Sequence, residues 1–174
     1  MNRLCSLVYS FVKNARDKSH NYFCKRDKTM GVKVIEWKDT IPFVPPIKIG
    51  QVIKVYDGDT IMIASSLPIP NAPMYRFPVR LRGIDAPEMK GKNEDEKRAA
   101  RISQKALESL VLHKNVTLKN VETEKYGRIL ADVFFYEVNL SEFMLKNNYA
   151  VEYHGGTKKP PDSWLDFQTT GIVE

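Results

Sequence analysis

Cysteine and long hydrophobic runs are scarce in this sequence of 174 residues. The two cysteines, Cys5 and Cys24, are too few for a disulfide framework, and their spacing is not that of a metal site. A reducing compartment is therefore the simpler expectation, and an intracellular location is favoured, although secretion stays open. The apolar run from Leu4 to Val12 is shorter than the ~20 residues that span a bilayer, and no small-residue cleavage site follows it. We expect neither a spanning helix nor a signal peptide there.

Positive charge is concentrated at the start of the chain. The formal net charge of +6 suggests a polyanionic partner. Residues 1–45 carry nine Lys or Arg and four Asp or Glu, so only +1 remains for residues 46–174. Anion binding by the second part should therefore depend on a few placed arginines.

Residues 1–45 are predicted to form a basic extension that ends in a proline-rich linker at 41–46, before a domain at 46–174. Apolar side chains at helical spacing within residues 1–18 indicate an amphipathic helix. Such a helix could lie on an anionic membrane surface or on a protein partner, or it could pack on the protein itself or belong to a loosely ordered tail. The apolar positions are Leu4, Leu7, Val8, Phe11 and Val12, and Lys13, Arg16 and Lys18 follow them.

The sequence after residue 46 has the patterns of short strands. Runs rich in β-branched residues at Ile47–Tyr56 and Thr60–Ala64 flank the turn dipeptide Asp57-Gly58 and predict a hairpin. A third strand is predicted at Tyr75–Ile84, where Pro78 indicates a bulge or an exposed edge. Two further strands are predicted at Asn115–Val121 and Ile129–Phe135.

Three helices are indicated. Residues 93–114 have a helical period, with Asn93 as the N-cap. Ser141 is predicted to cap a short helix that ends at Asn148, and Asp162 or Ser163 to cap a last one. The apolar stripe of the first helix should face the core with Ile102, Ala106, Leu107, Leu110 and Val111. Because the strands are too short and turn-rich for a parallel α/β fold, we predict an α+β fold, a five-stranded antiparallel barrel with attached helices.

The stretch from Arg80 to Glu88 carries the strongest chemical signal. Arg80 and Arg82 share one face of the predicted strand, since side chains alternate with period two. Asp85 and Glu88 follow where Pro87 ends the strand. This arrangement suits a cation and a phosphate together, although an exposed strand with a solvated turn would also have this pattern.

Three segments in this order resemble the staphylococcal nuclease (thermonuclease) family over roughly residues 48–155. They are Asp57-Gly58-Asp59-Thr60, Arg80 to Glu88, and Glu124-Lys125-Tyr126-Gly127-Arg128. The resemblance implies an OB-type five-stranded barrel with about three helices.

The resemblance also implies roles for individual residues. Calcium would be bound by the carboxylates of Asp59 and Asp85 and by the backbone carbonyl of Ala86, where the best-studied relatives have a threonine. Because Ala86 lacks the hydroxyl of that threonine, a hydrogen bond that would support the metal ligands is in doubt. The catalytic glutamate falls on Glu88. The two arginines that bind phosphate fall on Arg80 and Arg128.

Other residues near these motifs are candidates for substrate contact. Arg82 stands where bacterial relatives usually have an apolar residue, and its shared face with Arg80 favours a contact with the substrate backbone. Tyr153 lies near the place where relatives stack aromatic residues on nucleotides, and Tyr126 either contacts substrate or packs. Alternatives stay open for two motifs: Asp57 and Asp59 could serve only as turn formers, and Arg128 could pair with Glu124. His154 is expected to be a loop residue, since the family uses no histidine in its chemistry.

The function that follows from this resemblance is metal-dependent hydrolysis of phosphodiester bonds in DNA and RNA, with little sequence specificity. Calcium is the expected ion, and other divalent ions stay open. The alternative is a non-catalytic module that binds nucleic acid or a protein partner. Because relatives of that kind usually lack several catalytic residues, the complete set here argues for the enzyme. The sequence makes no prediction of the oligomeric state.

Overall fold

The computed structural model describes residues 34–124 and 126–172. The chain divides into two compact units, Met1–Ile41 and Pro42–Glu174. In the first unit, the described residues form a short 3-10 turn, η1 (Trp37–Asp39), in which the Glu36 backbone N–H donates to Asp39 Oδ2 at 3.0 Å. The amphipathic helix predicted within residues 1–18 lies outside the described residues. In the part of the chain that is described, every helix is too short or too polar to cross a membrane.

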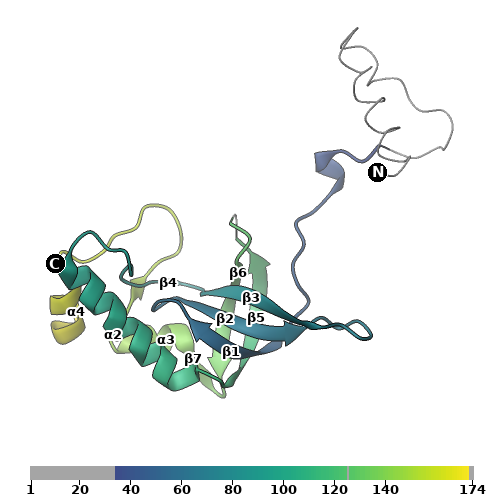
Figure 1. The fold of residues 1–174 in the computed structure, drawn as a ribbon. Helices are drawn as coiled ribbons and strands as arrows, with labels where there is room; N and C mark the ends of the chain where they lie inside the picture. Colours follow the sequence, from purple (N-terminus) through teal and green to yellow (C-terminus); the bar gives the residue numbers. More distant parts are fainter. Residues whose placement is uncertain (1–33, 125, 173–174) are drawn as a thin grey trace, which may run out of the picture. The chain divides into compact units, whose positions relative to one another are not determined.

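Five strands of the second unit close into a barrel (Figure 1). Their order is β3-β2-β1-β5-β6, and β3 also pairs with β6. The predicted α+β barrel is confirmed, but the closing pair, β3 with β6, is parallel rather than antiparallel. The reason is geometric, because strands that alternate in direction cannot close a ring with an odd number of members. The strands are β1 (Ile49–Val55), β2 (Thr60–Ser66), β3 (Met74–Leu81), β5 (Asn115–Thr123) and β6 (Ile129–Phe135).

The third strand is shorter than the predicted Tyr75–Ile84. It ends at Leu81, because the chain turns through Arg82 and Gly83, whose φ of 83° glycine adopts without strain. The next two residues form β4 (Ile84–Asp85), which pairs with β8 (Val151–Glu152). Pro78 pairs in register with β2, and β6 pairs with β3 only from residue 79 onward, so Pro78 lies at an exposed edge and not in a bulge.

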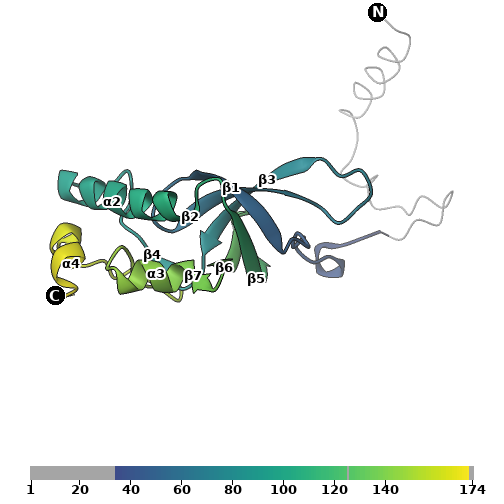
Figure 2. The same ribbon diagram turned by 90° about the horizontal axis from the view of Figure 1, so that it is seen from below.

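The three helices lie together on one side of the barrel in both ribbon views (Figures 1 and 2). Asn93 caps the first, as predicted, by accepting a hydrogen bond from the Glu96 N–H at 2.7 Å. The second is capped by Asn139 and not by Ser141, whose hydroxyl donates instead to the Arg82 carbonyl at 2.8 Å. Ser163 caps the third. The helices are α2 (Glu94–Val111), α3 (Leu140–Lys146) and α4 (Trp164–Thr170), and a two-residue strand, β7 (Val138–Asn139), precedes α3.

The buried face of α2 differs from the predicted stripe. Ile102 is 44% exposed, while Ser103 is fully buried and donates its hydroxyl hydrogen to the Tyr149 carbonyl at 2.7 Å. Ser103 thus occupies a core position that the hydrophobic pattern did not predict, because its hydroxyl is satisfied by a backbone carbonyl. The buried residues of this helix are Ala99, Ala100, Ser103, Leu107 and Val111.

Candidate functional site

The β1–β2 turn places Asp59 against the segment that follows β4. The Asp59 N–H donates to Asp57 Oδ1 at 3.0 Å, which closes the turn around Gly58. A Cβ at Gly58 would lie 2.8 Å from the Cβ atoms of both Ala86 and Ser103. Only glycine therefore lets this turn approach so closely, and the approach brings Asp59 beside Asp85.

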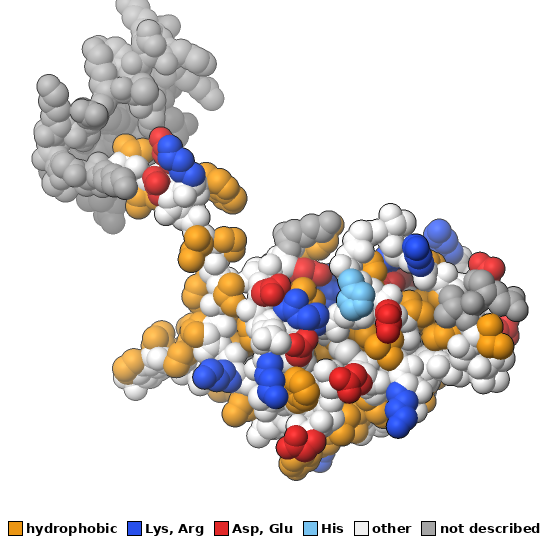
Figure 3. Space-filling model, turned by 180° about the vertical axis from the view of Figure 1, so that it is seen from behind, with side chains coloured by type: hydrophobic (Ala, Val, Ile, Leu, Met, Phe, Trp, Pro, Cys, Tyr) orange, Lys and Arg blue, Asp and Glu red, His pale blue; other side chains and the backbone are white. Residues whose placement is uncertain are grey.

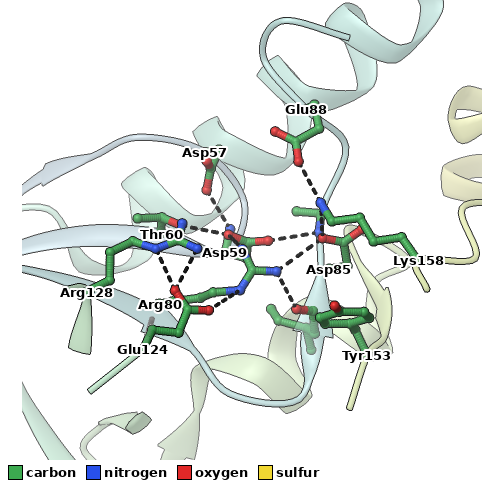
Figure 4. Close-up of polar contacts among 12 residues, drawn as sticks. Asp57, Asp59, Thr60, Arg80, Asp85, Glu88, Glu124, Arg128, Tyr153 and Lys158 are labelled. Atoms are coloured by element: carbon green, nitrogen blue, oxygen red, sulfur yellow. Dashed lines mark hydrogen bonds and ion pairs between the residues drawn. The ribbon is translucent and has the colours of Figure 1, made fainter. Parts of the chain in front are cut away.

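The Arg80 guanidinium lies at the centre of the site (Figure 4). Its Nη1 donates to Asp59 Oδ1 at 2.8 Å, and its Nη2 donates to Asp85 Oδ1 at 3.1 Å and to the Ile84 carbonyl at 3.2 Å. Burial, with only 8% of the residue exposed, acts to lower the pKa of Arg80, but the surrounding carboxylates outweigh it and raise the pKa above its ordinary value. The site therefore contains a permanent, oriented positive charge.

Asp59 is buried and its negative charge is incompletely balanced. Burial, followed by the charge of Asp57, raises the pKa of Asp59 from 3.8 to about 7. Arg80, the Thr60 hydroxyl at 2.7 Å and the Ala86 N–H at 3.2 Å oppose this shift and do not cancel it. An additional cation beside this carboxylate would therefore favour its ionised form.

Lys158 joins Asp85 to Glu88. Its Nζ lies 2.9 Å from Asp85 Oδ1 and 2.7 Å from Glu88 Oε1. Burial acts to lower the pKa of Lys158, and these two carboxylates outweigh it and raise the pKa to about 12. The Glu88 side chain is 59% exposed, so this carboxylate, unlike that of Asp85, faces solvent at the edge of the site.

Glu124 lies between the two arginines that the sequence singled out. Its Oε2 accepts hydrogen bonds from Arg128 Nη2 at 2.7 Å and Nε at 2.8 Å, and its Oε1 is 3.9 Å from Arg80 Nε. The pairing of Arg128 with Glu124, left open by the sequence, is present. The position between the two guanidinium groups therefore accommodates an anion.

The oxygen donors and the charge balance suit a divalent cation. Asp59 and Asp85 are both buried and both accept hydrogen bonds from Arg80, and oxygen-rich sets of this kind bind hard cations such as Ca²⁺. No group of three or more His, Cys, Asp or Glu side chains forms a ligand shell within the described ranges. The predicted calcium ligands are the carboxylates of Asp59 and Asp85 and the backbone carbonyl of Ala86. This set contains only two such side chains, and it stays a prediction. Among the residues labelled in Figure 4, five carboxylates face three cations, a formal charge of −2: Asp57, Asp59, Asp85, Glu88 and Glu124 against Arg80, Arg128 and Lys158.

Comparison with known sequences identifies the family. The profile of the family described as "Staphylococcal nuclease homologue" matches residues 78–165, about half of the chain. The chain belongs to the staphylococcal nuclease family. The matched range contains Arg80, Asp85, Glu88, Arg128 and Lys158. The resemblance inferred from the three sequence motifs is thus confirmed.

Three similar proteins show how much of the chain is shared with known sequences. A protein of Escherichia coli named "Uncharacterized endonuclease" is 36% identical over 107 residues, 60% of this chain and 60% of that protein. A Haemophilus influenzae protein of the same name is 36% identical over 103 residues, 59% of this chain and 51% of that one. A "Probable staphylococcal-like nuclease" of Oryza sativa subsp. japonica is 32% identical over 85 residues, 49% of this chain and 21% of that one. The chain thus spans about three fifths or less of the length of these relatives.

Arg82 has a different position from the one predicted. The two arginines do not share a strand face, because β3 ends at Leu81 and Arg82 belongs to the turn that follows. Its Nη2 donates to the Asn120 carbonyl at 2.6 Å, and its Nε lies 3.4 Å from Asp132 Oδ1. These contacts connect the β3–β4 turn to the β5–β6 pair. The contact of Arg82 with substrate stays a prediction.

A cavity of about 510 Å³ adjoins Arg80 and Arg82. Tyr153 and His154 line it, and the Tyr153 hydroxyl donates to the Gly156 carbonyl at 3.1 Å. Tyr126 is 74% exposed in the connection between β5 and β6. Acidic and basic side chains are interspersed on the face of the second unit, Pro42–Glu174, seen in Figure 3, so this face is not uniformly basic.

Two features of the site were not predicted from the sequence. The bridging position of Glu124 had a weak local signal, its spacing of four residues from Arg128. Lys158 had none, because it is 70 residues from Glu88 in the chain. The glycine pair that precedes it at 155–156 indicates only a turn.

The raised pKa of Asp59 predicts the pH dependence of the metal-free protein. Between about pH 4 and pH 7 the native state holds a proton on Asp59 that the unfolded chain has lost, so stability should fall as the pH rises through this window. Urea unfolding in chelator at about pH 5 and about pH 8 should show a loss of ~2–4 kcal/mol in wild type that Asp59→Asn largely removes. An excess of Ca²⁺ should reduce the loss. Equal pH slopes in wild type and Asp59→Asn would show that Asp59 ionises normally.

Proposed function

We propose that this chain is a nuclease that hydrolyses phosphodiester bonds of DNA and RNA with little sequence specificity, and that it uses a divalent cation, with calcium as the expected ion. The observation that carries the proposal is the Arg80 guanidinium, buried and bonded to the Asp59 and Asp85 carboxylates, with Glu88 linked to the same Asp85 through Lys158. The names of the E. coli and rice relatives, an endonuclease and a nuclease, support it.

The phosphate would bind near the two arginines. In the structure the Glu124 carboxylate lies between Arg80 and Arg128. A substrate phosphate could replace this carboxylate as the partner of the two arginines. Arginine suits this role because its planar fork binds two phosphate oxygens and stays charged. Negative charge that grows on the non-bridging oxygens during hydrolysis would be stabilised by these fixed cations. A bound Ca²⁺ held by Asp59, Asp85 and the Ala86 carbonyl would polarise a phosphate oxygen.

Glu88 is the proposed general base. Its carboxylate lies at the solvent-exposed edge of the site, where it can accept a proton from an attacking water. The water oxygen forms a new bond to phosphorus, the bond from phosphorus to the leaving oxygen breaks, and that oxygen takes up a proton. The family resemblance implies that the product keeps a 3′-phosphate. Low sequence specificity follows, because phosphate contacts and base stacking carry little sequence information.

The test is cleavage of single-stranded DNA, double-stranded DNA and RNA by the full chain, with Ca²⁺, with Mg²⁺ and with chelator. We expect cleavage of all three substrates with Ca²⁺ and none with chelator. Cleavage that persists in chelator would contradict the metal dependence. A folded protein that binds these nucleic acids and cleaves none of them would instead support a non-catalytic binding module.

A further inference from the structure

We propose that Lys158 is a positioning residue for this reaction, which holds the Glu88 carboxylate beside Asp85. The inference rests on the proposed function, because it assigns a role in the same site. Lys158 Nζ contacts Glu88 Oε1 at 2.7 Å and Asp85 Oδ1 at 2.9 Å, so a single ammonium group fixes the separation of the two carboxylates (Figure 4).

Glu88 needs such a partner because of where it lies. Its side chain is more than half exposed, and a glutamate in that position ordinarily samples several rotamers. Among the described residues, the polar contacts of its carboxylate go to Lys158. Asp85, in contrast, is buried and held by Arg80. Lys158 therefore connects the exposed Glu88 side chain to the buried Asp85 side chain, which Arg80 holds in place.

The loop that carries Lys158 is itself anchored near the site. The Tyr153 N–H donates to the Gly83 carbonyl at 2.9 Å, and the Tyr153 hydroxyl donates to the Gly156 carbonyl at 3.1 Å. Gly155 and Gly156 have φ of 98° and 85°, conformations that residues with a Cβ rarely adopt. This closed turn ends two residues before Lys158. The backbone thus directs the lysine toward the site from a region distant in sequence.

The ammonium of Lys158 contacts one of the two oxygens of the Asp85 carboxylate. Lys158 and Arg80 both use Oδ1 of Asp85, and in the described part of the chain the contacts of this carboxylate all go to that oxygen. Lys158 can therefore keep Glu88 in place and still leave Oδ2 of Asp85 available to a metal ion. If instead Lys158 occupied the metal's own position, removing it would strengthen metal binding.

The experiment compares Lys158→Met with Lys159→Met, a matched change at the neighbouring exposed lysine, in the full chain. For Lys158→Met we expect a 10- to 100-fold lower kcat with little change in KM, because a misplaced base slows the chemical step more than binding. Lys159→Met should match wild type, and Lys158→Arg should restore part of the rate. In a Glu88→Gln background, Lys158→Met should cause no further loss. Ca²⁺ affinity, measured by calorimetry without substrate, should not fall, because the variant removes a positive charge from beside Asp85.

Several results would overturn the inference. A kcat equal to wild type would remove it while the proposed function stood. If Lys158→Met lowered kcat by the same factor in the wild-type and Glu88→Gln backgrounds, Lys158 would act independently of the Glu88 carboxylate. Tighter Ca²⁺ binding by Lys158→Met with an undiminished rate would make Lys158 a competitor of the metal. A folded wild-type chain that cleaves nothing would refute the proposed function itself, and the inference with it.

Discussion

Replacing Glu88 with glutamine is expected to slow phosphodiester cleavage by about 10²- to 10⁴-fold, the range that general acid–base catalysis contributes. Glutamine has nearly the same shape but cannot accept a proton from water at neutral pH. Because the Glu88 side chain is largely exposed and its ion pair with Lys158 lies at the surface, the free energy of unfolding should change by less than about 1 kcal/mol.

The measurement is the single-turnover rate on a short DNA substrate with saturating Ca²⁺, together with urea unfolding of the same preparation. Glu137→Gln is the control, because Glu137 is an exposed glutamate in the turn between β6 and β7, outside the site. Its rate should equal that of wild type. A Glu88→Gln variant that keeps more than about a tenth of the rate would exclude Glu88 as the general base.

Replacing Arg80 with methionine is expected to destabilise the metal-free protein by about 3–5 kcal/mol, as removal of one partner of a buried ion pair does. Methionine fills much of the same volume, but it leaves the Asp59 and Asp85 carboxylates buried without their shared cation. A divalent ion bound by the same carboxylates should restore part of the lost stability. Cleavage should fall by at least ~10²-fold even with Ca²⁺, because an oriented phosphate-binding donor is lost.

Urea unfolding in chelator and in Ca²⁺ separates these effects. Arg76→Met is the matched control, since Arg76 is an exposed residue of β3 that pairs with Ala64 of β2, and its stability should stay within about 0.5 kcal/mol of wild type. If Arg80→Met and Arg76→Met unfold at the same urea concentration in chelator, the carboxylates around Arg80 do not depend on its charge.

Local chemistry explains which parts of the site could be predicted. The turn around Gly58, the cap at Asn93 and the stretch from Arg80 to Glu88 each depend on residues close together in sequence. Their patterns, and the order of the three motifs, were enough to predict the barrel and the family, and both are confirmed. The separation of Arg80 from Arg82 was not predictable in the same way, because a strand pattern does not show that the chain turns at Gly83.

The sequence by itself determined the α+β class, the family and the carboxylates and arginines that are candidates for chemistry, because these depend on short-range patterns and their order. Only the tertiary structure decided the parallel closure of β3 on β6, the position of Glu124 between two arginines and the approach of Lys158 to Glu88. Each of these depends on segments that converge in space after the barrel closes. The energy of such contacts is set by distance and burial, which the linear order of residues does not contain.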